Sequence, residues 1–163
     1  MHIAELNIAE AYYPMDSAEM ESFTSQIDAI NAIADRSPGF VWRLVDDDPD
    51  CDGALGIRFP GAGEKTLVNM SVWDNAESLI DFMYNTVHAK IMARKDEWFT
   101  KMLSHHFVLW YVPEGHIPDL LEASEKLDHL NENGPSPAAF TFRSAFDADG
   151  NPIDLKLPAK VIN

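Results

Sequence analysis

Several features that mark particular classes of protein are scarce or missing in this sequence. Its 163 residues include a single cysteine, Cys51, which has no partner for a disulfide within the chain. No apolar run reaches the ~18 residues of a membrane span. The N-terminal segment lacks the basic start, apolar stretch and small-residue cleavage site of a signal peptide. We therefore expect a cytoplasmic protein with no membrane partner.

Positive charge is also scarce, because 12 lysines and arginines face 27 aspartates and glutamates, a net charge of −15. Nucleic acids and anionic membrane surfaces are bound through basic patches, so neither is an expected partner. The metal-binding patterns HExxH and paired CxxC are missing as well. Residues 48–53 match the start of a calcium loop, but Phe59 stands where the twelfth-position acid belongs. We therefore expect no bound metal.

Hydrophobic residues make up 46% of the chain, and they follow regular patterns. Their alternation with other residues predicts strands at 2–9, 40–45, 54–59, 65–73 and 105–113. A spacing of three to four residues predicts helices within 16–39, 75–103 and 119–133. A further short strand is expected within 138–146. The length suits a single domain, 1–163, with a core at about 1–113 and a C-terminal helix and tail at 114–163.

The order of the main elements is strand, helix, strand, strand, helix, strand. This βαββαβ order predicts an α+β fold, a ferredoxin-like sandwich in which the helices cover one face of the sheet. The other face needs a cover, since bulky side chains recur at alternate strand positions: Trp42, Leu44, Val68, Met70, Val72, Phe107, Leu109 and Tyr111. Two sheets placed face to face would bury this surface, so we expect a homodimer.

The segment "VNMSVWDNAESLIDF" resembles the dimeric α/β-barrel superfamily. That superfamily includes antibiotic-biosynthesis monooxygenases, heme-degrading monooxygenases and the stress-responsive proteins related to olivetolic acid cyclase. Through "RSPGFVWRL", "NMSVWDNAESLIDFMYNTVHAKIMARKDEWF" and "GPSPAAFTFR", the whole chain most closely resembles an uncharacterised bacterial family within it. The resemblance implies a dimeric α/β barrel with an apolar pocket between sheet and helices in each subunit.

The resemblance also implies candidate functions. The leading hypothesis is a small-molecule enzyme resembling the cofactor-independent monooxygenases, acting on an apolar or aromatic substrate without a cofactor. His88 resembles the acid–base histidine of the cyclase, whose tyrosine partner is replaced by Phe82. A heme-binding or heme-degrading protein, with His88 as the axial ligand, is an alternative. A non-catalytic ligand-binding or stress-response protein is another.

The residues themselves allow acid–base chemistry at His88. If residues 75–103 form one unbroken helix, Tyr84 and His88 lie one turn apart on the same face. An imidazole titrates near neutral pH and therefore suits proton transfer with an enol or phenol. The Tyr84 hydroxyl beside it would hold an oxyanion. The alternative interpretation places both side chains at the seam between sheet and helix, with hydrogen bonds to the backbone.

The pocket itself is predicted from aromatic residues and one arginine. The aromatic candidates for its wall are Trp42, Phe82, Trp73, Trp98 and Trp110, which would suit a flat apolar ligand. Arg43 is the candidate for binding a carboxylate or for supporting the base. The alternatives are ordinary core packing for each aromatic side chain and an ion pair with an acid for Arg43.

Overall fold

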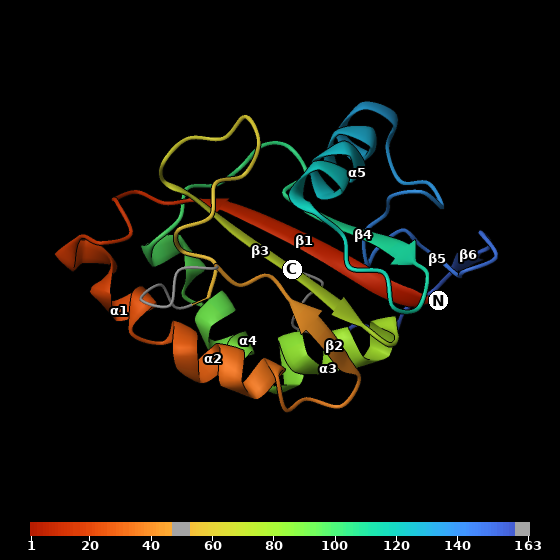
Figure 1. Cartoon of the computed structure of the whole chain (residues 1–163), viewed down its shortest axis with the longest axis horizontal. Helices are drawn as coiled ribbons and strands as arrows, with labels where there is room; N and C mark the ends of the chain where they lie inside the picture. The colour runs from red at the N-terminus through yellow and green to blue at the C-terminus, as the bar shows by residue number, and fades with distance from the viewer. Residues whose placement is uncertain (47–52, 159–163) are drawn as a thin grey trace.

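The computed structural model describes residues 1–46 and 53–158, so Cys51 and most of the predicted acidic turn lie outside the described residues. Its centre is a four-stranded antiparallel sheet in the order β2-β3-β1-β4 (Figure 1). The strands are β1 His2–Glu10, β2 Phe40–Arg43, β3 Thr66–Trp73 and β4 Phe107–Val112. The predicted α+β, ferredoxin-like fold is confirmed by this order and by the helices between the strands.

Helices cover both faces of the sheet (Figure 1). One face is covered by the shorter helices α1 Glu21–Thr24, α2 Ile27–Ala34, α3 Ala76–Asn85 and α4 His88–Met92, with 3-10 turns at Ala18–Met20 and Lys95–Glu97. The other face carries α5, Leu120–Asn133. A small hairpin of β5 Ala145–Phe146 and β6 Pro152–Ile153 follows. No helix among the described residues is long and apolar enough to cross a membrane.

The unbroken helix predicted across Tyr84 and His88 is wrong. The chain leaves α3 at Thr86, whose ψ of −174° is extended rather than helical. The Thr86 hydroxyl donates to the Phe82 carbonyl oxygen at 2.6 Å and accepts from the His88 amide at 3.2 Å. A threonine side chain thus replaces backbone hydrogen bonds at the junction, which allows one helix to end and α4 to begin in a new direction.

The strand predicted at 54–59 is also absent from the described residues. Its backbone makes local turns instead, with hydrogen bonds from the Ile57 amide to Ala54 and from the Ala62 amide to Phe59. Ala54 and Phe59 are nevertheless buried. The apolar pattern in this segment therefore records packing against the core, because buried loop residues and strand residues can have the same alternation.

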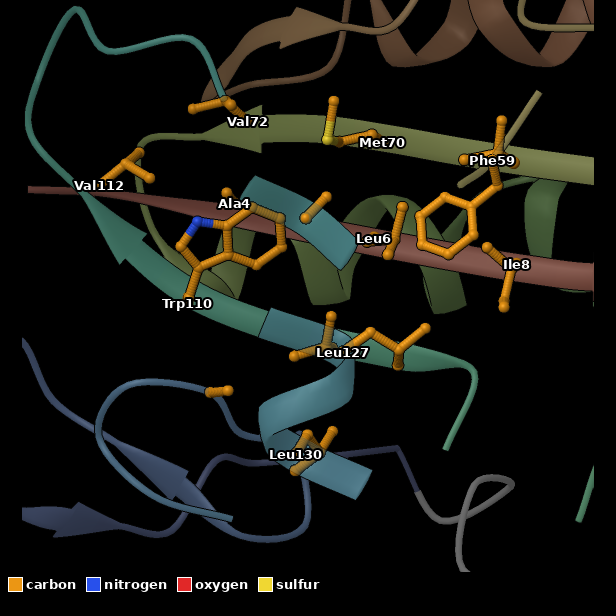
Figure 2. Packing of buried hydrophobic residues seen from close by; sticks show 14 residues of the cluster. Ala4, Leu6, Ile8, Phe59, Met70, Val72, Trp110, Val112, Leu127 and Leu130 are labelled. Atoms are coloured by element: carbon orange, nitrogen blue, oxygen red, sulfur yellow. The ribbon is translucent and has the colours of Figure 1, made fainter. Parts of the chain in front are cut away.

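The face expected to bind a second subunit is covered by the chain's own α5 (Figure 2). Leu127 and Leu130 of α5 pack in the same cluster as Leu6, Met70 and Trp110. Met70 and Trp110 are only 2% and 1% exposed within one chain. The homodimer stays a prediction, but the part of the sheet face formed by Met70 and Trp110, from which it was argued, is already covered by α5.

The residues proposed for that face also need correction in β4. Leu109 pairs with Glu5 and Phe107 with Asn7, so these two side chains share the face covered by α3. The face under α5 instead receives Val108, Trp110 and Val112. A one-residue difference in phase moves every side chain of a strand to the opposite face, which explains the error.

The segment after α5 completes the layer on the α3 side. Phe140 and Phe142 are buried beside Trp73 and Leu109, and Phe140 exchanges two backbone hydrogen bonds with Leu109 at the edge of the sheet. Residues beyond 113 therefore contribute to the packing of both faces. The division into a core at 1–113 and an addition at 114–163 stays a prediction.

Candidate functional site

A cavity of about 710 Å³ lies between the sheet and the helices that cover its α3 side. Its volume is in the range of small-molecule sites. The sheet provides polar side chains to its wall, and the helices provide mainly apolar and aromatic ones. The lining residues that matter for the chemistry are Glu5, Asn7, Arg43, Asn69, Ser71, Trp73, Phe82, Tyr84, His88 and Trp98.

His88 lines this cavity as the first residue of α4, directly after the break at Thr86. Its Nδ1 lies 3.2 Å from the Met83 carbonyl oxygen. A carbonyl can only accept, so Nδ1 carries the proton and the neutral ring has its lone pair at Nε2. Burial lowers the pKa of the His88 imidazole, against a smaller raising effect of the hydrogen bond to Met83. The ring is therefore neutral at pH 7, with Nε2 able to accept a proton.

Tyr84 lines the same cavity from the last turn of α3. Its ring lies edge-on to Phe142, with centroids 6.3 Å apart. Burial raises the pKa of the Tyr84 hydroxyl, and the positive charge of Arg143 acts in the opposite direction. The hydroxyl thus stays protonated and is a hydrogen-bond donor. The two residues share the cavity, although they do not share one helix.

Three of the five aromatic candidates line the cavity. Trp73 stacks on Phe82 with centroids 5.2 Å apart, and Phe82 in turn lies 5.0 Å from the His88 ring. The rings of Trp73, Phe82 and His88 thus form a continuous aromatic wall, with the His88 imidazole at its end. Trp98 lines the cavity farther along and donates from Nε1 to the Ser22 hydroxyl at 2.9 Å.

Trp42 and Trp110 require a correction, since they lie on the opposite face of the sheet. Trp42 pairs with Val72 and therefore shares its face, and Trp110 is packed beneath α5. The Trp110 Nε1 donates to Glu122 of that helix at 2.8 Å. Side chains alternate between faces along a strand, so four tryptophans on different elements had no common side that the sequence could reveal.

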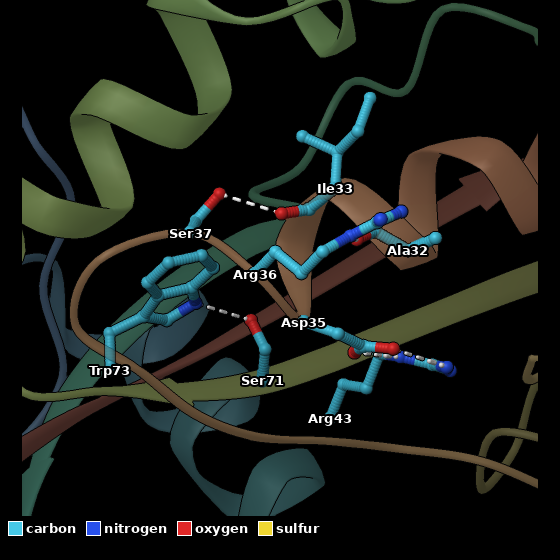
Figure 3. A network of polar contacts seen from close by, with 8 residues as sticks. All are labelled: Ala32, Ile33, Asp35, Arg36, Ser37, Arg43, Ser71 and Trp73. Atoms are coloured by element: carbon cyan, nitrogen blue, oxygen red, sulfur yellow. Dashed lines mark hydrogen bonds and ion pairs between the residues drawn. The ribbon is translucent and has the colours of Figure 1, made fainter.

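Arg43 lines the cavity at the end of the edge strand β2. Its Nε and Nη2 bind both oxygens of Asp35, at 2.8 and 3.3 Å, as Figure 3 shows. The ion pair predicted as the alternative role of Arg43 is therefore present. Among the described residues, its Nη1 is buried and has no hydrogen-bond partner. One edge of the guanidinium is thus engaged with Asp35, and the other is not.

Sequence reasoning missed a row of polar residues on the two central strands. Glu5 faces Ser71 across β1 and β3, and Asn7 faces Asn69 one step along. All four line the cavity. The available signal was their spacing: polar residues at every second position of a strand form one face, and in these two strands that face lies under the helices.

Glu5 is the most unusual member of this row, because it is a carboxyl group with only 8% of its surface exposed. It accepts a hydrogen bond from the Ser71 hydroxyl at 2.8 Å, and that hydroxyl accepts one from Trp73 Nε1 at 2.8 Å (Figure 3 shows the second bond). Burial raises the pKa of the Glu5 carboxyl from 4.5 to about 7, against a smaller lowering effect of Ser71. Glu5 therefore titrates in the physiological range.

The arrangement offers little for a metal ion, since the described residues contain no group of three or more histidine, cysteine, aspartate or glutamate side chains placed to hold one. Among the histidines that line the cavity, His88 and His106, the Nε2 of His88 is the axial ligand that the heme alternative would use. Arg43, the candidate for binding a carboxylate such as a heme propionate, already forms an ion pair with Asp35.

Comparisons with known proteins place the chain in a family. A family model described as "Domain of unknown function (DUF3291)" matches residues 2–155. No curated protein matches the chain.

Among solved structures, a protein of unknown function from Nitrosomonas europaea is similar at 11% identity and a TM-score of 0.48, over 72% of this chain and 95% of that one. SnoaB, a cofactor-independent oxygenase from Streptomyces nogalater, is similar at 17% identity and a TM-score of 0.43, over 72% and 98%. The family model spans residues 2–155 of this chain, and the chain therefore belongs to the DUF3291 family.

Proposed function

We propose that this family member is a small-molecule enzyme of the cofactor-independent monooxygenase type, acting on an apolar or aromatic substrate. The observation that carries the proposal is a neutral imidazole at the end of an aromatic wall inside a cavity of about 710 Å³. The fixed proton on Nδ1 of His88 leaves Nε2 as a base. The half-buried ring of Phe82, supported by the fully buried Trp73 on which it stacks, would hold a flat ring system beside that base.

The chemistry follows from what a protein without a redox cofactor can do. Removal of a proton from an activated C–H or O–H group gives a substrate anion, and this anion supplies the electrons that dioxygen takes up. A CH₂ group next to a carbonyl or an aromatic ring then becomes C=O, with the second oxygen atom leaving as water. Substrate and dioxygen balance in this reaction, so the protein needs to supply only a base, a dry pocket and polar support.

Polar support for the developing oxyanion comes from several side chains of the cavity. Tyr84 is a protonated donor on the helix side. Asn7 and Asn69 bring amide donors from the sheet side, at paired positions of adjacent strands. Donors of this kind, fixed before the reaction, stabilise charge more effectively than water does.

The test combines binding and oxygen uptake. Titration calorimetry with 2-naphthol, a flat aromatic hydroxyl compound, is expected to give saturable binding at one site per chain. An oxygen electrode is expected to record uptake with 2-tetralone, a flat aromatic ketone, in the absence of metal and flavin. His88→Ala should abolish uptake. His105→Ala, a matched control at an exposed histidine outside the cavity, should leave it unchanged.

Three results would contradict the proposal. Failure of 2-naphthol to bind would remove the predicted ligand class. Binding without oxygen uptake would contradict the monooxygenase type, and binding without any reaction would indicate the non-catalytic ligand-binding alternative. Uptake that persists in His88→Ala would show that the imidazole is an ordinary helix residue, since loss of the essential base costs orders of magnitude in rate.

A further inference from the structure

The carboxyl group of Glu5 lies at a buried strand position of the kind that ordinarily carries an apolar side chain. It occupies the middle of β1, between β3 and β4, where its partners across the strands are Ser71 and Leu109. An ionisable group in such a place costs stability unless it is neutral and hydrogen-bonded. Buried ionisable groups inside a ligand-sized cavity are frequent at functional sites.

The carboxyl is held in a defined orientation. The Ser71 hydroxyl has one proton, and it accepts from Trp73 Nε1 at 2.8 Å, so it gives that proton to Glu5 Oε1 at 2.8 Å. Among the described residues, the hydrogen bond of Glu5 involves Oε1 alone. Oε2 is therefore the oxygen left for a ligand in the cavity that Glu5 lines.

Glu5 and His88 line the same cavity from two different elements. Glu5 comes from the sheet, and His88 comes from the start of α4 on the helix side. Trp73 links the two, because its Nε1 begins the hydrogen-bond chain to Glu5 and its ring begins the aromatic wall to His88. The lining of the cavity therefore offers a flat ligand both a carboxylic acid and a neutral imidazole.

We propose that Glu5 is a second catalytic residue, a general acid that protonates the carbonyl oxygen of an apolar aromatic ketone while His88 removes a proton from the adjacent carbon. This inference rests on the proposed function and specifies its substrate class. The product of the step is the enol, the form that a subsequent reaction with dioxygen would use.

Atoms and electrons balance in this step. His88 Nε2 takes the proton of the C–H bond, and the electron pair of that bond forms the C=C bond. The carbonyl π pair moves to oxygen, which takes the proton from Glu5 Oε2. The products are an enol, an imidazolium and a carboxylate, and proton exchange with water restores both groups. The step needs no oxidant, so it can be measured apart from oxygenation.

The experiment measures hydrogen–deuterium exchange at the CH₂ next to the carbonyl of 2-tetralone, in D₂O without oxygen, by proton NMR. The wild-type protein should accelerate the exchange above the protein-free rate. Glu5→Gln should lower the accelerated rate by about 100-fold, because glutamine keeps the shape and a donor but cannot transfer a proton. Binding of 2-naphthol should change by less than about threefold, since that donor remains.

Glu10→Gln is the matched control. Glu10 lies on the same strand and also accepts from a β3 hydroxyl, that of Thr66 at 2.6 Å, but it is outside the set of residues lining the cavity. The Glu10→Gln substitution should therefore leave the exchange rate unchanged. Ser71→Ala provides a second variant, which loosens the carboxyl and should lower the rate by about tenfold.

The outcomes separate this inference from the proposed function. Exchange that depends on His88 but is unchanged in both Glu5→Gln and Ser71→Ala would overturn the role of Glu5 and leave the base in place. Exchange that depends on both residues, without oxygen uptake, would support this step and contradict the monooxygenase assignment. No exchange by the wild-type protein, with or without 2-naphthol binding, would overturn both.

Discussion

His88 is turned back onto the end of α3, with its Nδ1 3.2 Å from the carbonyl oxygen of Met83. This contact closes the junction between two helices and fixes which ring nitrogen carries the proton. Because the carbonyl would otherwise end the helix without a partner, the same contact stabilises the fold and prepares the candidate base.

The partly buried position of His88 predicts how its imidazole titrates. Burial lowers the pKa of the His88 imidazole, so its titration midpoint should fall below 6.5. The ring should therefore stay neutral at pH 7 with its proton on Nδ1. Proton–nitrogen NMR of the histidine side chains, assigned with His88→Ala, measures both the midpoint and the tautomer. A midpoint above 6.5 would contradict this environment.

The carboxyl of Glu5 predicts a pH-dependent stability. Its pKa is raised to about 7, so between pH 4.5 and 7 the folded protein holds a proton that the unfolded chain has released. Its contribution to stability is complete below about pH 4.5 and is lost as the pH rises through about 7, by about 3 kcal/mol in total. Glu5→Gln should remove this loss. Denaturant unfolding of both proteins from pH 4 to 8 tests it, and parallel curves would contradict the raised pKa.

Thr86→Val tests the junction between α3 and α4. Valine keeps the shape of threonine but loses the hydroxyl that bonds Phe82 and His88. We expect a loss of about 1 kcal/mol in the free energy of unfolding, together with a shifted His88 NMR signal. Thr24→Val is the control, because its hydroxyl also bonds a backbone carbonyl, that of Met20 at 3.3 Å, but lies far from His88 in the chain. An unmoved His88 signal would show that Thr86 does not position the ring.

Hemin should bind without a sharp Soret band that depends on His88. The reason is that Arg43, the candidate partner for a heme propionate, is already paired with Asp35. Absorption spectra of the wild-type protein and His88→Ala during hemin titration provide the measurement. A sharp band that is lost in the variant would favour the heme-binding alternative over an organic substrate.

The predicted homodimer should have twice the chain mass of 18.3 kDa in light scattering. Since α5 covers the centre of this sheet face, contacts between subunits would have to use its edge, where Trp42 and Leu44 are half-buried at or next to strand β2. Trp42→Ala would then weaken association more than it changes the fold. A mass near that of one chain would contradict the homodimer.

Local patterns were sufficient for the main elements but not for their ends or junctions. The alternation at 65–73 corresponds to β3, and the spacing at 119–133 corresponds to α5. The break at Thr86 depends on a side-chain hydroxyl that bonds two backbone groups, which hydrophobic periodicity does not register. The segment at 54–59 has a strand-like pattern because it is buried, although its backbone forms turns.

The candidate site was likewise predicted only in part from local sequence patterns. His88, Tyr84, Phe82, Trp73, Trp98 and Arg43 were named from the sequence, and all of them line one cavity. Glu5 and Ser71 were passed over because single polar residues in a strand ordinarily face water. Their burial results from helices, formed by distant parts of the chain, that cover that face of β1 and β3.

The sequence by itself determined the α+β class, the order of the main strands and helices along the chain, and the residues with useful chemistry, because these depend on short-range periodicity and on residue type. Only the tertiary structure decided that α5 covers the second sheet face, that Trp42 and Trp110 point away from the cavity, and that Glu5 lies within it. These are long-range relationships. Strand register and helix placement determine which side chains share a face, and the pKa of a carboxyl depends on what surrounds it once that face is covered.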